Sequence, residues 1–285
     1  MPRRDLRDAR CLVTGASSGL GRALAVALVQ RGARVVLAAR SPDKLRDVAD
    51  SLIADGAQPN AVLPFPSDVT SPEDREDLLA FASDHFGGAL DVAINNAGVG
   101  AYGRFQSHSE SVSRQVFEVN VFALMEMTRG FLPMLRQGRR PALCNIGSIV
   151  ARRALPGRSE YSASKFAVAG FTEAIRAEWA CEGIDVLLLN PGFTATDFEK
   201  NLVIDTAIYK TDGRRTMTAE VVAEATLRAL ERGRKEVTLS AQGRLLLLAN
   251  RLAPRFVDWG LGLWTKKLYA DVAGLERAEG PKPPA

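Results

Sequence analysis

CLVTGASSGLG, residues 11–21, is a short apolar run that leads directly into a glycine-rich turn. Residues 11–14 have the length and composition of a buried strand, and an amphipathic helical pattern follows the turn. Glycine at Gly15, Gly19 and Gly21 lets the backbone of such a turn approach a pyrophosphate, which then lies on exposed N–H groups at the helix amino end. A purely structural turn is the alternative, but the position at a first strand within a βαβ unit favours a dinucleotide site.

The composition describes an ordinary globular chain. Its 285 residues are 46% hydrophobic and 25% charged, enough to bury one substantial core. The formal net charge of +4 is too small and too dispersed to indicate nucleic-acid binding. Cys11, Cys144 and Cys181 lie far apart without C-x-x-C spacing, so we predict no metal site, no disulfide framework and a reducing compartment. Without a recognisable signal sequence or a spanning apolar run, a cytoplasmic protein is expected.

Short aliphatic runs alternate with longer helical patterns from residue 10 to about residue 240, which is typical of βαβ units. We therefore predict an α/β, Rossmann-like, doubly wound fold, with a seven-stranded parallel sheet that carries helices on both faces. Residues 1–240 are expected to form this single domain, 241–279 a C-terminal amphipathic helical extension and 280–285 a disordered tail. The expected strands are 10–14, 34–39, 61–65, 91–95, 142–147, 185–190 and 236–239; the expected helices are 19–31, 41–55, 71–86, a pair within 111–137, 161–181 and 218–232.

Further motifs follow the glycine loop in a recognisable order. They are Asn95-Asn96-Ala97-Gly98, Ser148, Tyr161-x-x-x-Lys165 and Pro191-Gly192. Together with T-G-x-x-x-G-x-G at residues 14–21, they resemble the classical short-chain dehydrogenases/reductases over roughly residues 8–240. The extended branch of that family carries G-x-x-G-x-x-G and a longer substrate domain, and this chain matches neither feature.

The resemblance implies an oxidoreductase that interconverts a carbonyl and a secondary alcohol on a small-molecule substrate with a nicotinamide cofactor. It implies that Asp68 and the backbone amide of Val69 hold the adenine, and that Thr194 and Thr196 hold the nicotinamide carboxamide. The implied cofactor-binding residues are Gly15, Ser17, Ser18, Gly19, Leu20, Gly21, Asp68, Val69, Asn95, Ala97, Gly98, Tyr161, Lys165, Pro191, Gly192, Thr194 and Thr196.

The end of the second expected strand bears on which nicotinamide cofactor is used. NAD-preferring folds usually place an acidic residue there, on the ribose 2′-hydroxyl, whereas this sequence has Arg40 and Ser41. A guanidinium is a fixed fork that suits a 2′-phosphate. NADP(H) is therefore favoured over NAD(H), and the alternative is that Arg40 is a solvated residue at a strand end.

Tyr161 and Lys165 would be neighbours on one helix face whether or not they act chemically. Carbonyl reduction needs a proton donor beside the hydride, and a phenol titrates near pH 10. An ammonium one turn away stabilises a phenolate, so we expect Lys165 to lower the pKa of Tyr161. The resemblance adds Ser148 as a hydrogen-bond partner of the substrate oxygen and Asn120 as the holder of a water between Lys165 and solvent. A turn or cap role for Ser148 is the alternative, whereas an asparagine inside an apolar helix is otherwise unexpected.

Substrate specificity is encoded less clearly. Arg152 and Arg153 could meet an anionic substrate group, but exposed loop arginines are the commoner case and the one favoured here. Residues 194–216 are polar and irregular and fit a mobile lid.

Residues 244–267 form an amphipathic stripe with two tryptophans. At 100° per residue, one arc is mostly basic and the opposite arc holds Leu246, Ala253, Phe256 and Trp264. Peripheral membrane contact and docking on the chain's own domain or on a second subunit are both open, with Pro254 able to split the helix. Membrane contact would favour an apolar substrate such as a steroid, a retinoid or an acyl-chain ketone.

Two other expectations complete the prediction. A non-catalytic dinucleotide-binding sensor or scaffold is the alternative function, although such a protein has no reason to keep Ser148, Tyr161, Lys165 and Asn120 together. The resemblance also implies a homodimer or homotetramer assembled through helices 111–137 and 161–181.

Overall fold

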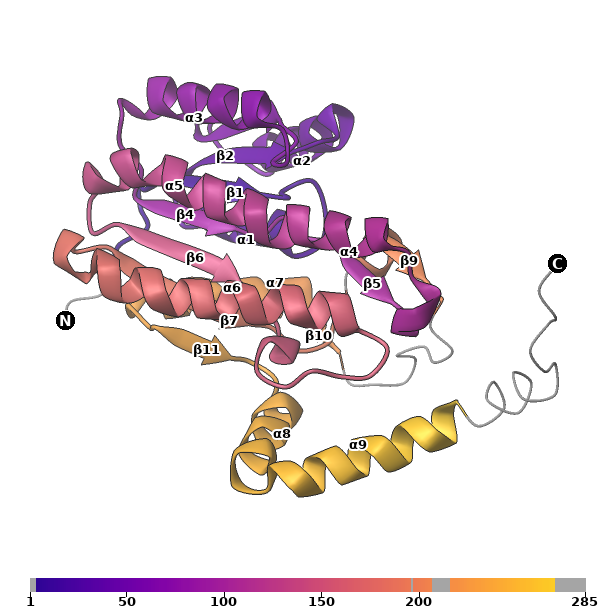
Figure 1. Cartoon of the computed structure of the whole chain (residues 1–285). Helices are drawn as coiled ribbons and strands as arrows, with labels where there is room; N and C mark the ends of the chain where they lie inside the picture. The colour runs from indigo at the N-terminus through magenta and orange to yellow at the C-terminus, as the bar shows by residue number, and fades with distance from the viewer. Residues whose placement is uncertain (1–3, 196, 207–215, 270–285) are drawn as a thin grey trace, which may run out of the picture.

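The computed structural model of the chain describes residues 4–195, 197–206 and 216–269. Its centre is a seven-stranded parallel sheet of order β11-β7-β6-β4-β1-β2-β3, which confirms the predicted fold class (Figure 1). The strands are β1 (Arg10–Thr14), β2 (Arg34–Ala39), β3 (Val62–Pro66), β4 (Val92–Asn95), β6 (Ala142–Ile146), β7 (Asp185–Asn190) and β11 (Glu236–Thr238).

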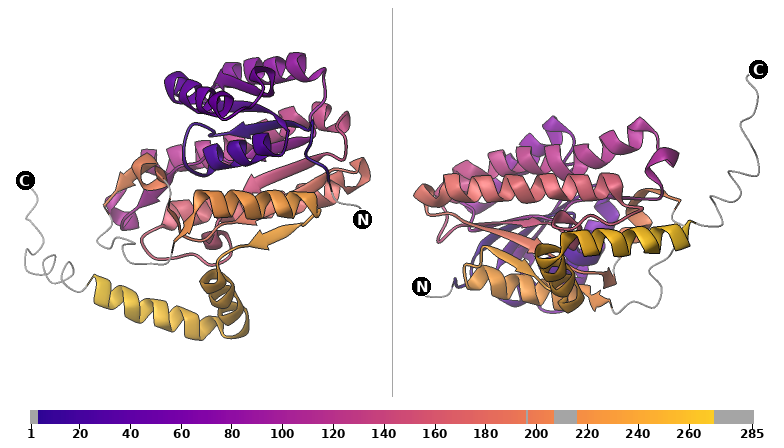
Figure 2. Two further views of the ribbon diagram at one scale, coloured as in Figure 1. Left: turned by 180° about the vertical axis from the view of Figure 1, so that it is seen from behind. Right: turned by 60° about the horizontal axis from the view of Figure 1, so that its bottom comes forward.

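Helices cover both faces of the sheet, as Figure 2 shows from two further sides. On one face, α1, α2 and α7 bury a core with the strands, and on the other α3, α5 and α6 do so. β2 illustrates the division, since Val35 and Leu37 belong to the first core and Val36 and Ala38 to the second. The helices before residue 240 are α1 (Gly19–Gln30), α2 (Pro42–Ala54), α3 (Pro72–Phe86), α4 (Glu110–Phe117), α5 (Ala123–Arg136), α6 (Ser159–Glu178) and α7 (Ala219–Glu231).

The predicted helix starts are found at Ser41 and Ser71. Ser71 caps α3 by accepting a hydrogen bond from Asp74 N at 3.1 Å. Ser41 precedes Pro42 at the start of α2 but has no side-chain capping contact. The Ser41 hydroxyl therefore makes no capping hydrogen bond to the helix that starts after it.

The strand order positions the functional site. β2 and β3 lie on one side of β1, whereas β4 and the later strands lie on the other. Connections from β1 and β4 therefore leave the sheet in opposite directions, which opens a crevice at the carboxyl ends of these two strands. The glycine loop follows β1, and residues 96–98 follow β4, so both stretches meet at this crevice.

Two short parallel pairs lie outside the main sheet. β5 (Gly100–Tyr102) pairs with β9 (Leu202–Asp205), and β8 (Thr194–Ala195) pairs with β10 (Met217–Thr218). Parts of the predicted lid at 194–216 thus form short strands. Residues 207–215 of that lid lie outside the described residues.

The C-terminal stripe forms two helices rather than one. α8 (Ala241–Leu252) and α9 (Pro254–Leu268) meet at Ala253, whose φ of −141° and ψ of 64° break the helical path. Pro254 causes the break, because it has no N–H to donate and disfavours the helical conformation of the residue before it. A single 100° projection across residues 244–267 is therefore wrong. Among the described residues, no helix is long and apolar enough to span a bilayer.

Candidate active site

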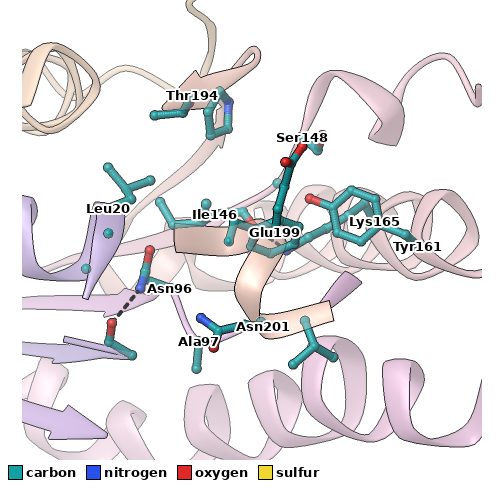
Figure 3. Close-up of a pocket in the computed structure, with 18 of the residues that line it drawn as sticks. Leu20, Asn96, Ala97, Ile146, Ser148, Tyr161, Lys165, Thr194, Glu199 and Asn201 are labelled. Carbon is teal, nitrogen blue, oxygen red and sulfur yellow. Dashed lines mark hydrogen bonds between the residues drawn. The ribbon is translucent and has the colours of Figure 1, made fainter. Parts of the chain in front are cut away.

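A cavity of about 610 Å³ lies at the crevice. It is lined by segments that follow all seven strands of the main sheet and by residues of α6, α8 and α9. Figure 3 shows Leu20, Asn96 and Ala97 on one side of it and Ser148, Tyr161 and Lys165 on another. The predicted residues that line it are Gly15, Ser17, Ser18, Gly19, Leu20, Gly21, Arg40, Ser41, Asp68, Val69, Ala97, Gly98, Ser148, Tyr161, Lys165, Pro191, Gly192 and Thr194.

The glycine loop is built by close approach of backbone. Gly15 has a φ of 67°, and a Cβ built on Gly21 would lie 2.1 Å from the Gly15 carbonyl oxygen. Asn96 holds the loop from the β4 side, because its Nδ2 donates to the Thr14 and Gly15 carbonyls at 2.9 and 3.2 Å. A dashed line marks a hydrogen bond of Asn96 in Figure 3. The loop is therefore fixed as a cradle with no room for a side chain at Gly15 or Gly21.

The amino end of α1 fits a pyrophosphate. Ser18 stands at its N-cap without a side-chain capping bond, and its first turn holds no acidic residue. Residues 17–21 all line the cavity. The first N–H groups of a helix and its dipole favour an anion, so this end suits the phosphates of a dinucleotide.

The adenosine side is lined by residues after β2 and β3. Arg40 is exposed at the cavity edge beside Ser41, and Lys44, one turn into α2, lines the same edge. Asp68 Oδ1 accepts hydrogen bonds from Thr70 N and Oγ1 at 2.9 and 2.7 Å, which orients its carboxylate. Lys44 is a functional candidate that sequence reasoning missed, although its place one turn after Ser41 was a usable signal.

Two predicted residues do not line the cavity, and one lies outside the described residues. The Asn95 side chain is buried and donates to Thr128 Oγ1 at 2.9 Å and to Asn145 Oδ1 at 3.0 Å. Its neighbour Asn96 faces the cavity instead. Asn120 lies behind the lining, and Thr196 is not among the described residues.

Asn120 lies in a π-helical turn, Glu118–Phe122, that joins α4 to α5. It is fully buried and its amide is used on both sides: Oδ1 accepts from Val99 N at 2.8 Å, and Nδ2 donates to Val99 O at 2.9 Å and to Ser164 Oγ at 3.0 Å. π-turns within helices often mark functional sites. Asn120 thus ties the segment after β4 to the helix that carries Tyr161.

Tyr161 and Lys165 lie one turn apart on α6, and both are buried. Lys165 Nζ lies 5.9 Å from the centre of the Tyr161 ring and donates to the Ile146 carbonyl at 2.8 Å. Ser148 follows β6, and its side chain interacts with the Tyr161 phenol. The structure therefore brings Ser148, Tyr161 and Lys165 together.

The predicted lowering of the Tyr161 pKa by Lys165 is wrong for the protein without ligands. Burial raises the pKa of Tyr161, and the Ser148 hydrogen bond and the charge of Arg158 offset this only in part. Burial also lowers the pKa of Lys165 to about 8, so the same desolvation that disfavours the phenolate also disfavours the ammonium. The reason for the discrepancy is that both groups are desolvated, which spacing along a helix does not reveal.

Arg152 and Arg153 both form ion pairs with carboxylates. Arg152 contacts both Glu173 and Glu236, and Arg153 Nη2 lies 2.5 Å from Asp258 Oδ1 on α9. The role toward an anionic substrate group, which the sequence analysis did not favour, therefore gains no support at Arg152 or Arg153. A third arginine, Arg158, lines the cavity and was missed, although it stands only three residues before Tyr161.

The C-terminal helices close one side of the cavity. Leu246 of α8 and Leu261 and Trp264 of α9 line it, and Phe198 approaches the Tyr161 ring at 5.6 Å between centroids. Docking on the chain's own domain, one of the alternatives left open by the sequence, is therefore observed.

The matches to known proteins agree with this geometry. The family model of the short chain dehydrogenases matches residues 9–207. Dehydrogenase/reductase SDR family member 7B of Xenopus tropicalis is 34% identical over 245 residues, covering 82% of this chain and 78% of that protein. A short chain dehydrogenase from Burkholderia cenocepacia in complex with NADP aligns with a TM-score of 0.77 and 30% identity, over 90% of this chain and 99% of that one. One from Burkholderia phymatum in complex with NAD aligns with a TM-score of 0.76 and 26% identity, over 87% and 96%. The chain therefore belongs to the short-chain dehydrogenase/reductase family, whose members are oxidoreductases that use a nicotinamide dinucleotide.

Proposed function

We propose that the protein is an NADP(H)-dependent oxidoreductase that interconverts a carbonyl and a secondary alcohol. The observation that carries this proposal is the group of half-buried Ser148 and buried Tyr161 and Lys165 at one end of a cavity whose other end is a glycine cradle. The bound nicotinamide would supply or accept the hydride at the substrate carbon. Tyr161 would give its phenolic proton to the carbonyl oxygen during reduction and recover it during oxidation.

Each neighbour of Tyr161 supports one part of this proton transfer. The Ser148 hydroxyl lies beside the phenol and would donate to the substrate oxygen. Lys165, with a pKa lowered to about 8, can gain or lose a proton near neutral pH. Asn120 holds the Val99 backbone and Ser164 of α6 in place, so it fixes the wall behind Lys165. Replacement of Tyr161 by phenylalanine should abolish turnover and leave cofactor binding almost unchanged; substantial residual turnover would refute the assignment.

The preference for NADP(H) rests on the residues after β2. Arg40, Ser41 and Lys44 bring two cations and a free hydroxyl to the same cavity edge, where a 2′-phosphate adds negative charge. We expect Arg40→Ala to weaken NADPH binding about tenfold or more and NADH binding hardly at all. Arg46→Ala, in the exposed face of α2, is the matched control. Equal use of NADH and NADPH by the wild type would refute the preference.

An apolar substrate is supported by the walls beyond Tyr161. Leu155, Phe198, Leu246, Leu261 and Trp264 surround this part of the cavity. A series of ketones and aldehydes of graded polarity, assayed with NADPH, tests this point. We expect kcat/KM to rise with apolar area; a preference for small polar ketones would contradict it.

We also propose peripheral membrane contact through the outer face of α8 and α9. The residues of this outer face are all at least 46% exposed, and they are Leu245, Leu248, Leu252, Phe256, Trp259 and Leu263. Exposed Arg244, Arg251, Arg255 and Lys266 accompany them, a combination that suits an anionic lipid surface.

Vesicle flotation tests the membrane proposal. The full-length protein should float with vesicles of phosphatidylcholine and phosphatidylserine, and a Leu248→Ser, Phe256→Ser, Trp259→Ser variant should not. Val221→Ser removes an equally exposed apolar side chain from α7 and should leave flotation unchanged. Absence of wild-type flotation would disprove the contact.

A homodimer or homotetramer is supported by two exposed phenylalanines. Phe122 in the π-turn and Phe166 on α6 are 53% and 45% exposed, on the helices through which assembly is expected. Light scattering should report an oligomer, and Phe166→Asp should dissociate it. Phe105→Asp, at another exposed phenylalanine, is the control.

A further inference from the structure

Arg158 is a buried cation in the wall of the cavity. It occupies the N-cap position of α6, the helix that carries Tyr161, and only 6% of its surface is exposed. The segment 100–102 and the Pro191-Gly192 loop supply the neighbours of its side chain. Its guanidinium carbon lies 4.0 Å from the centre of the Tyr102 ring and 5.2 Å from that of Phe193.

These two rings hold the guanidinium without using its donors. Cation–π contacts stabilise a cation through the ring faces, and they leave the N–H groups free. Within the described part of the chain, no oxygen accepts a hydrogen bond from the Arg158 side chain, and no carboxylate pairs with it. A buried charge without such a partner is costly, so an anion that completes it gains binding energy.

Four other arginines, buried Arg4 and half-buried Arg10, Arg152 and Arg153, show what is missing at Arg158. Arg4 donates to three backbone carbonyls and to Asp185, and Arg10 forms two side-chain hydrogen bonds with Asp91. Arg152 and Arg153 also have carboxylate partners. Arg158 differs from all four because it faces a cavity rather than an internal acceptor.

Arg158 belongs to the substrate end of the cavity. It lies close enough to Tyr161 for its charge to act on the phenol, whereas the phosphates of a dinucleotide fit the amino end of α1 and the edge at Arg40. Glu199 also lines the cavity, but its side chain is exposed. Apolar walls of the cavity are formed by Leu155, Phe198, Leu246, Leu261 and Trp264, and Arg158 is the buried cation among the lining residues that are not placed at the nicotinamide.

We propose that Arg158 binds a carboxylate of the substrate, so that the substrate is an apolar carbonyl compound, or the matching alcohol, with one carboxylate group. The inference rests on the proposed oxidoreductase function and narrows its substrate class. A planar carboxylate can accept two parallel hydrogen bonds from the guanidinium edge that the two rings leave open. Tyr161 then acts on the carbonyl while Arg158 fixes the other end of the molecule.

Matched acids and esters test the proposal. Benzoylpropionate, benzoylbutyrate and benzoylvalerate differ by one methylene each, and their methyl esters keep the ketone but remove the charge. Full-length wild type, Arg158→Met and Arg158→Lys are compared by kcat/KM with NADPH, and by calorimetric binding of each probe to the protein saturated with NADP⁺. Arg152→Met is the matched control, because that arginine already has two carboxylate partners.

For at least one chain length, the wild type should favour the acid over its ester by about 10- to 100-fold, the range of a charge-assisted hydrogen-bond pair. Arg158→Met should remove this preference, Arg158→Lys should restore part of it, and Arg152→Met should keep it. Unchanged NADP⁺ affinity shows that the variants are folded.

Two results would overturn the proposal: no acid preference in the wild type for any chain length, or an equal loss for acids and esters in Arg158→Met. The second result would mean that Arg158 acts only through the Tyr161 phenol. If no probe is turned over but acids bind in an Arg158-dependent way, the oxidoreductase assignment fails and the carboxylate site stands.

Discussion

Replacing Lys165 by methionine should stabilise the ligand-free protein while it abolishes turnover. Burial lowers the pKa of Lys165 from 10.5 to about 8, so the fold disfavours the ammonium. A decrease of this size corresponds to about 3 kcal/mol at neutral pH. Loss of the hydrogen bond to the Ile146 carbonyl removes about 1 kcal/mol of stability. We therefore expect Lys165→Met to raise the free energy of unfolding by about 2 kcal/mol at pH 7.

The gain should vanish as the pH rises. Below the folded-state pKa of about 8, Lys165 is protonated in both the folded and the unfolded chain, and the full cost of burying the charge is present. Between that value and 10.5, the folded protein releases the proton first, so unfolding takes up a proton and wild-type stability increases with pH. By pH 10 only about 1 kcal/mol of the cost remains, which the Ile146 hydrogen bond offsets.

Urea unfolding of the ligand-free proteins, followed by tryptophan fluorescence at pH 7, 8.5 and 10, measures this difference. Lys235→Met replaces an exposed lysine and should show no pH-dependent gain over the wild type. The variant and the wild type share every other titratable group. The difference between their free energies of unfolding at each pH therefore reports the titration of Lys165. A Lys165→Met variant that is less stable at pH 7, or whose advantage is constant up to pH 10, would refute the burial argument.

Three further substitutions test the glycine cradle and the ion pair between Arg10 and Asp91. Gly21→Ala should lower cofactor affinity at least about 100-fold, because its Cβ would lie 2.1 Å from the Gly15 carbonyl oxygen and a backbone atom cannot yield; NADPH fluorescence measures this. Asn96→Ala removes two hydrogen bonds to the loop and should weaken NADPH binding about tenfold, with little change in the melting temperature. Asp91→Asn leaves the Arg10 guanidinium without its charged partner and should cost about 3 kcal/mol in urea unfolding. Since hydrogen bonds from Arg10 hold the pKa of Asp91 below 3.8 despite burial, this stabilisation should be present above that value and disappear as the pH falls through the lowered pKa.

The main sheet could be predicted because its central strands are buried aliphatic runs and its strands are separated by helical patterns. The limits of β1, β2 and β7 agree with the predicted ones. The glycine cradle could also be predicted, because it requires a particular backbone conformation and a close approach of backbone atoms. Glycine is required at Gly15 and Gly21 whichever side chains pack around the loop. The spacing of these glycines therefore predicts the turn without knowledge of the tertiary structure.

Side-chain direction could not be predicted in the same way. Asn95 and Asn96 are adjacent and chemically identical, yet Asn95 joins a buried polar row with Asn145 on the neighbouring strand and Thr128 on α5, while Asn96 holds the cradle. The difference depends on which face of the sheet each residue meets, and on partners far apart in sequence. The same limit applies to Tyr161, whose pKa is set mainly by burial.

In the C-terminal extension, one break in the helical path changes which side chains share a face. A continuous helix over 244–267 would place Leu246, Phe256 and Trp264 on one face. Because the path breaks at Ala253, Leu246 and Trp264 face the cavity, and Phe256 faces outward with Trp259. The two helices therefore present an inner apolar face to the cavity and an outer apolar face to their surroundings. Since different side chains form these faces, variants of the outer face can test surface contact while the cavity wall opposite Tyr161 stays intact.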